Sequence, residues 1–403
     1  MNEVRAVVEA FDGASARGER CALATVVSVE GSAYRRPGAR MLVCEGGAST
    51  GTISAGCLES DVIEHAKRVI RSGKAVLVEY DTASTGEEMA WGLGLGCNGV
   101  VRVLVEPLAH GSSYVEALRR SCEAHAAPLW VATVYQHTPS DASAAAARVK
   151  TGARLFVGDG GEVGREKLGE RAAAILEDEV RALSLGGETS GARVVEVDGG
   201  AVKVFVETLL PPVSLVIFGA GHDALPVVEL ARNLGWRTVV VDPQARPASM
   251  ARFAAAATVT LARPEEVAAK VRLTPRTLAL LMTHNYSHDL ALLRFLLASP
   301  ARYVGVMGPR KRTERMLGEL AAGKPEFRPE EADLSRLYSP AGLDIGANGP
   351  AEIALSIVAE MRAVLGGRRG GGLRERRGSI HGSQGDGKSV RLTEEQNLTV
   401  AMA

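Results

Sequence analysis

Two cysteines in this chain of 403 residues stand in glycine-rich turns, where a thiol can reach a ligand. Cys57 lies in the segment SAGCLE, at the point where a predicted strand passes into a predicted helix. A helix N-terminus lowers the pKa of a thiol and favours the thiolate. Cys97 lies in GLGCNG, whose glycines allow a bulky ligand to approach the backbone. Because both cysteines lie in glycine turns, we predict that Cys57 and Cys97 face one shared ligand. Thiolates suit soft metals, so such a metal is a candidate for that ligand. Burial in the core is the alternative for each.

A third glycine-rich turn, GAGHDA at 219–224, follows a buried strand pattern and opens a helix. Gly219 and Gly221 permit a tight turn, and the helix N-terminus presents free N–H groups to phosphate. Asp242 ends the next predicted strand, where an acid can accept a ribose hydroxyl. These features predict a Rossmann-like domain whose turn holds a phosphate-bearing ligand. A turn that closes the sheet and binds nothing is the alternative.

The segment MTHNYSHD at 282–289 leaves the carboxyl end of the fourth predicted strand of this domain. Ligands of open α/β sheets bind along that edge. We therefore expect one crevice to be lined by His222, Asp242, His284, His288 and Asp289. The spacing of His284 and His288 predicts a metal site only if both lie on one helical face, and a helix cap is the simpler role for Ser287 or Asp289. A cationic turn, GPRKR at 308–312, could neutralise phosphate or could be a solvated helix start.

The elements that must position these residues divide the chain at the Pro211-Pro212 pair. Residues 1–110 alternate short strands with glycine-rich turns, and a helix is predicted over 58–72 with Gly73 as its C-cap. A strand is predicted over 49–56. Residues 111–212 form an α+β middle region that completes the N-terminal half, with a helix over 165–183. No clear internal repeat is evident.

After the prolines the pattern becomes regular and predicts the fold class of residues 213–367. Strands alternate with helices, which implies a doubly wound α/β domain with a parallel sheet. The strands are expected at 214–219, 237–242, 257–262, 277–282 and 302–308. A last helix follows Pro350. Glycine, arginine and serine dominate residues 368–403, which are predicted to be a disordered basic tail.

The composition excludes several classes of protein. Basic and acidic residues number 47 each, so total charge favours neither nucleic acid nor a membrane surface. No apolar run approaches the roughly 20 residues that cross a bilayer, and the N-terminus has the pattern of an amphipathic helix rather than a signal peptide. Five cysteines suit a reducing cytoplasm, and Cys21, Cys44 and Cys122 are predicted to be packing residues. We expect a cytoplasmic protein, with a homodimer as the commonest assembly.

Taken together, these segments resemble the XdhC/CoxI family of molybdenum cofactor insertion chaperones for xanthine dehydrogenase and related molybdenum hydroxylases. In the N-terminal half the resemblance rests on VEGSAYRRPGARMLV, GTISAGCLESDV and GLGLGCNGVVRVLVEPL. In the C-terminal half it rests on LVIFGAGHDALPVVELARNLGW, MTHNYSHD, YVGVMGPRKRT and SPAGLDIGANGPAEIALSIVAEM. It covers residues 10–107 and 213–381 and is weak across 111–212.

The resemblance implies a chaperone rather than a turnover enzyme. Such a protein binds molybdenum cofactor, supports its sulfuration with a cysteine desulfurase, and inserts it into apo-xanthine dehydrogenase or a related molybdenum hydroxylase. Cys57 and Cys97 stand at the two cysteine positions of the family and become candidate molybdenum contacts. The expected cofactor-binding residues of the C-terminal half are Gly219, Gly221, His222, Asp242, His284 and Asp289. Pro309 stands where many members have serine, and it removes a backbone donor from that turn.

Two other functions stay open. An NAD(P)-dependent oxidoreductase would use the same glycine turn and Asp242, with His284 or His288 as acid or base. The N-terminal half, however, has no recognisable substrate domain. A scaffold without enzymatic activity would bridge the desulfurase and the apo-hydroxylase through the arginine-rich tail, and it would bind these partners without affinity for the cofactor.

Overall fold

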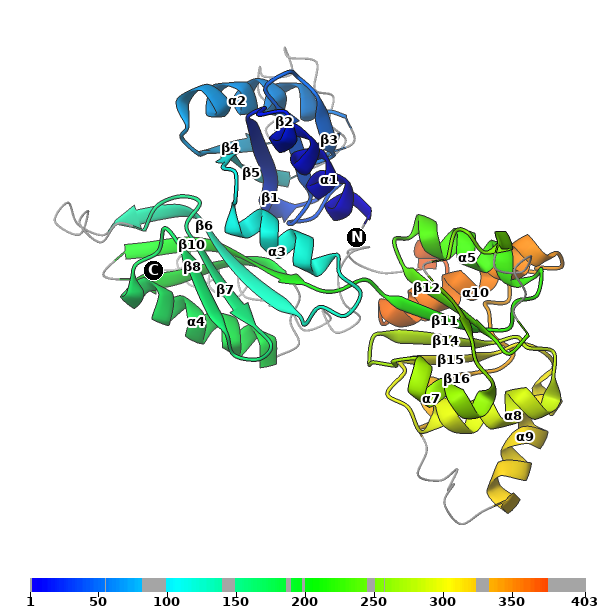
Figure 1. The fold of residues 1–403 in the computed structure, drawn as a ribbon. Coiled ribbons are helices and arrows are strands. Elements are labelled where there is room, and N and C mark those ends of the chain that lie inside the picture. The colour runs from blue at the N-terminus through cyan, green and yellow to red at the C-terminus, as the bar shows by residue number, and fades with distance from the viewer. Residues whose placement is uncertain are drawn as a thin grey trace, which may run out of the picture. The chain divides into compact units, whose positions relative to one another are not determined.

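The computed structural model describes residues 2–54, 56–81, 99–139, 149–185, 190–197, 200–244, 251–256, 258–323 and 333–375. The chain divides into two compact units, Met1–Pro212 and Val213–Ala403 (Figure 1). Cys97 and residues 376–403 of the predicted tail lie outside the described residues. No helix in the described part of the chain is long and apolar enough to cross a membrane.

The first half of the N-terminal unit is a five-stranded antiparallel sheet with the order β3-β2-β1-β5-β4. Its elements are α1 (Asn2–Ala16), β1 (Cys21–Gly31), β2 (Arg40–Cys44), β3 (Ser49–Gly51), α2 (Glu59–Ser72), β4 (Val76–Asp81) and β5 (Gly99–Leu108). Alternate residues of β1 face opposite sides of the sheet. Ala22, Ala24 and Val26 pack with α2, whereas Cys21 and Leu23 pack with α1 and α3.

The second half of this unit is another five-stranded antiparallel sheet, with the order β8-β7-β6-β10-β9. Its elements are α3 (Ser113–Ser121), β6 (Leu129–Pro139), β7 (Arg154–Gly158), β8 (Val163–Glu166), α4 (Glu170–Leu185), β9 (Gly191–Val197) and β10 (Gly200–Leu209). The helix predicted over 165–183 is α4, but Arg165 and Glu166 belong to β8. The strands β7 and β8 were not predicted.

The two halves share their element order and their sheet order, so the unit is an internal duplication, and the prediction of no repeat is wrong. Cys21 pairs with Cys44 and Leu108 in the first copy, as Leu129 pairs with Gly158 and Leu209 in the second. This register aligns three segments without gaps: LATVV with VATVY, GARMLVCEGG with GARLFVGDGG, and GVVRVLVEPL with GAVKVFVETL. A bulge falls at the equivalent residues Val27 and Tyr135.

Two buried ion pairs join the two copies, and in each pair an arginine of one copy contacts a glutamate of the other. Arg40 of the first copy pairs with Glu207 of the second, and the equivalent Arg154 pairs with Glu106. Tyr114 of α3 joins them, because its hydroxyl donates to Glu207 at 2.6 Å and accepts from Arg40 Nε at 3.1 Å. The Arg154 guanidinium lies 4.0 Å from the centre of the same ring. Charges in a core must be paired in this way to be tolerated.

The C-terminal unit has a six-stranded parallel sheet with the order β13-β12-β11-β14-β15-β16. Its strands are β11 (Ser214–Phe218), β12 (Arg237–Asp242), β13 (Thr258–Leu261), β14 (Thr277–Leu281), β15 (Tyr303–Val306) and β16 (Leu337–Tyr338). Its helices are α5 (Ala224–Asn233), α7 (Val267–Lys270), α8 (Tyr286–Leu297), α9 (Arg310–Gly323) and α10 (Pro350–Leu365). The five predicted strands are confirmed, and the two-residue β16 was missed.

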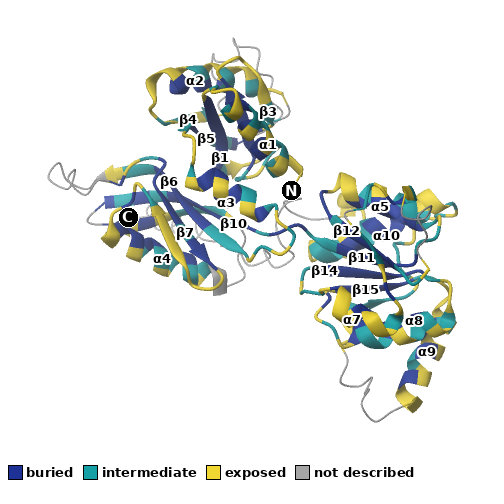
Figure 2. Cartoon of the chain, in the orientation of Figure 1, coloured by how far each residue is buried: buried dark blue, intermediate teal, exposed yellow. Residues whose placement is uncertain are grey.

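Helices cover both faces of this sheet, which confirms the doubly wound fold (Figure 1). Leu292 and Leu296 of α8 and Met316 of α9 pack on one face. Val227 of α5 and Ile357 of α10 pack on the other. The central strands are therefore buried on both sides (Figure 2). The strand order reverses between β11 and β14, and ligands bind at the carboxyl edge beside such a reversal.

Candidate functional site

Cys57 is exposed on a loop, residues 52–58, that joins β3 to α2. Among the described residues of the strand predicted over 49–56, Ser49–Gly51 form the strand β3, and the chain then turns to meet the start of α2. Glu59 accepts the Ser54 N–H at 2.8 Å, the Ile53 N–H at 3.2 Å and the Ser54 hydroxyl. Ser54 Oγ in turn accepts the Leu58 N–H at 3.1 Å. Ile53 and Leu58 are buried, so the loop is held at both ends while Cys57 faces outward.

The carboxylate of Glu59 therefore closes the Cys57 loop. Burial opposes its charge, but hydrogen bonds from the Ser54 hydroxyl and backbone hold the pKa of Glu59 below its usual value. A carboxylate with a lowered folded pKa stabilises the folded state above its unfolded pKa. The loop is thus closed at neutral pH, and this contribution is lost as the pH falls through the lowered pKa of Glu59.

Replacing Glu59 with alanine is expected to open the loop at neutral pH. The amides of Ile53 and Ser54 lose a charged acceptor, worth about 1.5–3 kcal/mol in total. Their hydrogen exchange should accelerate by about 10- to 100-fold, as measured by mass spectrometry of the peptide that contains them. Glu64→Ala is the control, because Glu64 lies on the exposed face of α2 and pairs with Lys67. Equal exchange in the two variants would contradict this role.

Arg35 holds the start of the same loop. Its Nη1 donates to Thr52 Oγ1 at 2.7 Å, and its Nη2 lies 2.6 Å from Glu3 Oε2. The side chain thus connects the β1–β2 turn, the N-terminus of α1 and the Cys57 loop. Arg35 was not among the predicted site residues, although it lies in the VEGSAYRRPGARMLV motif.

The Cys57 loop distinguishes the first copy of the duplicated unit from the second. Residues 52–58 connect β3 to α2, whereas the equivalent connection from β8 to α4 is only 167–169. The Cys97 motif also lies in a connection that differs in length between the copies. In the first copy β4 ends at Asp81 and β5 begins at Gly99, whereas in the second copy only residues 198–199 separate β9 from β10. Since Cys97 lies outside the described residues, its approach to Cys57 stays a prediction.

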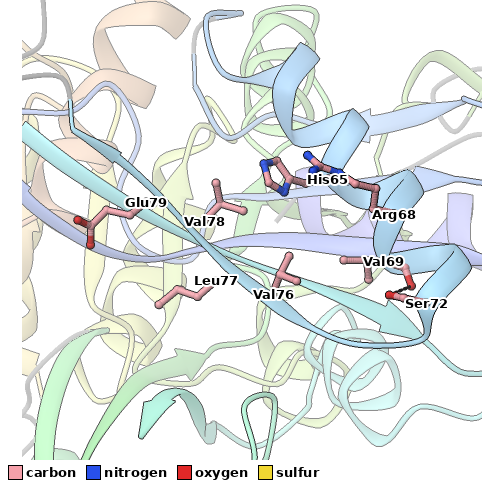
Figure 3. A pocket seen from close by; sticks show the side chains of 8 residues that line it. All are labelled: His65, Arg68, Val69, Ser72, Val76, Leu77, Val78 and Glu79. Carbon is pink, nitrogen blue, oxygen red and sulfur yellow. Dashed lines mark hydrogen bonds between the residues drawn. The ribbon is translucent and has the colours of Figure 1, made fainter. Parts of the chain in front are cut away.

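A hollow of about 350 Å³ lies farther along α2, where the helix passes β4 (Figure 3). Val69, Val76 and Val78 form apolar parts of its wall. His65 and Arg68 of α2 contribute polar groups to it. None of these residues was predicted as a site residue. The hollow belongs to the second half of α2, so Cys57 is not among its lining residues.

In the C-terminal unit, the backbone around the GAGHDA turn leaves no room for a side chain at Gly219, and the Asp223 side chain lies close to Gly221. Gly219 has φ +117°, and a Cβ there would lie 2.4 Å from the Met282 carbonyl oxygen at the end of β14. A Cβ at Gly221 would lie 2.3 Å from Asp223 Oδ1. The sequence predicted that these glycines permit a tight turn. The structure gives the physical reason: a Cβ at Gly219 would meet the backbone that follows β14, and one at Gly221 would meet the Asp223 carboxylate.

Replacing Gly219 with alanine is expected to destabilise the C-terminal unit by about 1–3 kcal/mol, the cost of strained backbone at such a site. The clash is with backbone, so it cannot be relieved by a side-chain rotation. Gly318→Ala is the matched control, because Gly318 lies in α9 with open space around it. That change should be neutral or stabilising by up to about 1 kcal/mol. Urea unfolding of both variants measures the difference, and equal stability would contradict the expected clash.

His284 and Asp223 are brought together at the carboxyl edge of this sheet. His284 Nε2 lies 2.8 Å from Asp223 Oδ2, and the His284 side chain remains 67% exposed. His284 also has φ +56°, a conformation that is uncommon for residues other than glycine. His222 is exposed at the start of α5, and His288 is half-buried on α8. The edge thus carries an exposed histidine oriented by a carboxylate.

Asp242, at the end of β12, binds the backbone of the glycine turn. Its Oδ2 accepts the Ala220 N–H at 2.9 Å, and its Oδ1 accepts the Gln244 N–H at 2.7 Å. One amide that could have faced a phosphate is therefore already paired. Asp242 and Asp223 together place two carboxylates beside the turn.

Asp289 is buried, and both of its oxygens are paired. Thr283 Oγ1 donates to Oδ1 at 2.7 Å, and Arg312 Nη2 lies 2.7 Å from Oδ2. Arg312 is the last residue of the predicted cationic turn, so part of that positive charge is used within the fold. The N-cap of α8 is Asn285, whose side chain accepts the His288 N–H, so the predicted cap at Ser287 or Asp289 is wrong.

Neither unit shows a preformed metal site in its described residues. No group of three or more His, Cys, Asp or Glu side chains is arranged there to hold an ion. His284 lies before the start of α8 and its ring pairs with Asp223, so the two histidines do not share one helical face. A metal-containing ligand would therefore bring most of its own coordination sphere.

Comparison with known proteins identifies the family. Residues 14–81 match the family model described as XdhC and CoxI family, and residues 215–361 match XdhC Rossmann domain. A Bacillus subtilis (strain 168) protein, named as a probable subunit of xanthine dehydrogenase, is 32% identical over 343 residues, covering 85% of this chain and 92% of that protein. The uncharacterized protein YqeB of Escherichia coli (strain K12) is 30% identical over 216 residues, which are 53% of this chain and 38% of YqeB. The crystal structure of a xanthine dehydrogenase from Bacillus halodurans has a TM-score of 0.68 and 30% identity, covering 90% of this chain and 97% of that one. The chain therefore belongs to the XdhC and CoxI family, as its motifs predicted.

Proposed function

We propose that this protein binds molybdenum cofactor, supports its sulfuration and inserts it into xanthine dehydrogenase or a related molybdenum hydroxylase. Family membership and the relatives' names support a role in the maturation of xanthine dehydrogenase. The observation that carries the proposal is the position of Cys57. It is an exposed thiol on a loop held by Glu59, in a segment that the second copy lacks.

Molybdenum cofactor supplies a soft metal, held by the dithiolene sulfurs of a pterin that also carries a phosphate. A thiolate suits such a metal, and one or two protein ligands allow it to be released to the next protein. We assign Cys57 as one molybdenum contact and Cys97 as the second. A cysteine desulfurase would reach an exposed thiol loop without unfolding the chaperone.

The carboxyl edge of the C-terminal sheet is proposed as a further place that contacts the cofactor. His222, His284 and Asp242 are the contact residues there, on a surface shaped by Gly219 and Gly221. Asp289 is buried, so its role in this proposal is to position Arg312, with which it pairs, rather than to touch the cofactor. The carboxylates of Asp223 and Asp242 disfavour a phosphate beside the turn and favour a ligand edge with N–H donors, such as the pterin ring.

The same carboxylates argue against an NAD(P)-dependent oxidoreductase. A dinucleotide places its pyrophosphate on the glycine turn and helix N-terminus. Here Asp223 fills the space beside Gly221, and Asp242 takes the Ala220 amide. No observation favours a scaffold that lacks cofactor affinity.

Reconstitution of apo-xanthine dehydrogenase tests the proposal. Isolated molybdenum cofactor is added to the apo-enzyme with and without this protein, and the yield of active enzyme is measured over time. We expect the protein to raise the yield and to retain cofactor but not NADH on a gel-filtration column. Equal yields, or retention of NADH alone, would contradict the proposal.

A further inference from the structure

Two of the cysteines that were predicted to be packing residues form a close pair. Cys21 begins β1 and Cys44 ends β2, and they face each other across the antiparallel ladder with their Sγ atoms 2.7 Å apart. The Glu45 N–H donates to the Arg20 carbonyl at 2.8 Å, which places this pair at a non-hydrogen-bonded position. Cα atoms at such positions lie about 4.5 Å apart, within the range of about 4.4–6.8 Å that a disulfide spans.

The surroundings of the pair differ from those of Cys57. Cys21 is 2% exposed and Cys44 is 4% exposed, and both pack among apolar side chains of α1 and α3. Burial raises the pKa of both thiols, so they are neutral at ordinary pH. The thiolate is the form that reacts and binds metals, so these two thiols do not serve as metal ligands, and they react slowly and only with an oxidant small enough to reach them.

The second copy of the duplicated unit shows that the fold does not require sulfur at this place. Leu129 and Gly158 occupy the positions equivalent to Cys21 and Cys44, in the same register of the same ladder. The two thiols are therefore a feature of the first copy alone, where both partners of one cross-strand pair are cysteine.

Contacts on either side of the pair hold it in register. Arg20 Nε donates to Glu45 Oε2 at 3.0 Å, and the Gly46 N–H donates to Glu19 Oε1 at 2.8 Å. These contacts join the residues that precede Cys21 to those that follow Cys44. The strands are thus positioned for a bond before any bond forms, and only a movement below about 1 Å separates 2.7 Å from an S–S length of about 2.05 Å.

We propose that Cys21 and Cys44 are a redox-convertible pair that closes into a disulfide between β1 and β2. With hydrogen peroxide as oxidant, one thiol loses its proton and the thiolate attacks the peroxide, whose O–O bond breaks to give a sulfenic acid and a hydroxide that takes up the proton as water. The second thiol then attacks the sulfenic sulfur, the S–O bond breaks, the S–S bond forms, and a second water leaves. A dithiol reductant reverses the step. The disulfide would fasten the first copy, while Cys57 stays outside it as the exposed thiol.

Peptide mass spectrometry of the full chain tests the pair. The protein is treated with hydrogen peroxide and then denatured in the presence of N-ethylmaleimide, which labels the free thiols. It is digested without reductant. We expect a Cys21–Cys44 disulfide in the wild type and in Cys57→Ala, and a melting temperature that is about 5 °C higher until dithiothreitol is added. The double variant Cys21→Leu with Cys44→Gly introduces the Leu–Gly pair of the second copy, so it should fold and show no such shift.

Both cysteines labelled by N-ethylmaleimide after peroxide treatment would overturn the proposal. A disulfide from either one to Cys57 as the main product would do the same. These outcomes are independent of cofactor binding, because no molybdenum is present in the experiment.

Discussion

Replacing Glu207 with alanine is expected to lower the free energy of unfolding of the N-terminal unit by about 3–5 kcal/mol, the cost of breaking a buried ion pair from one side. Arg40 would remain buried without its partner, and the Tyr114 hydroxyl would lose its acceptor. Burial opposes the charge of Arg40, yet the Glu207 carboxylate raises the pKa of that guanidinium above its usual value. In the variant that carboxylate is gone, but a guanidinium keeps its proton in proteins, so Arg40 cannot escape the cost by becoming neutral.

Two further variants make this prediction specific. Glu106→Ala breaks the equivalent pair with Arg154 and should cost a similar amount, because the duplication relates the two pairs. Glu45→Ala breaks the exposed pair with Arg20 and should cost at most about 1 kcal/mol. Urea unfolding curves of the three variants provide the measurement. A loss in Glu207→Ala no larger than that in Glu45→Ala would show that the buried pairs do not hold the two copies together.

The C-terminal fold could be predicted because its signals are local. Strands such as 214–219 and 277–282 are short apolar runs between helical patterns, and a parallel doubly wound sheet is the architecture such alternation implies. The strand β16 has only two residues, Leu337 and Tyr338, and offers no periodicity to read.

The duplication of the N-terminal unit could have been read from the sequence but was missed. GARMLVCEGG at 38–47 and GARLFVGDGG at 152–161 are plainly alike when aligned. The connections between the matching blocks, however, differ in length, as 52–58 and 167–169 do. A comparison of the sequence with itself at one fixed offset therefore misses the repeat. Aligning the two copies by the register of their strands reveals it.

The sequence could place the site residues at the ends of predicted strands, but it could not predict which side chains contact one another. The hydrogen bond between His284 and Asp223 joins residues 61 positions apart, and His284 there has a positive φ that its residue type does not predict. The burial of Asp289 depends on Arg312, which comes from the next helix. Such contacts arise from packing between elements, which spacing along one element does not report. Asp223 was for this reason not among the predicted site residues.

Retention of molybdenum by Cys57→Ala tests the proposed function most directly. The exposed thiol contributes little to the fold, so its removal should leave the protein stable while removing a sulfur ligand of the metal. Wild-type protein and variant are loaded with isolated molybdenum cofactor, passed over a gel-filtration column, and analysed for molybdenum by mass spectrometry. Cys122→Ala is the control, because Cys122 is partly buried at the C-cap of α3.

We expect the apparent affinity for the cofactor to fall at least about tenfold in Cys57→Ala, which corresponds to about 1.4 kcal/mol, and to stay unchanged in Cys122→Ala. Retention of molybdenum by Cys57→Ala at the level of the wild type would contradict the assignment of Cys57 as the contact that holds the cofactor.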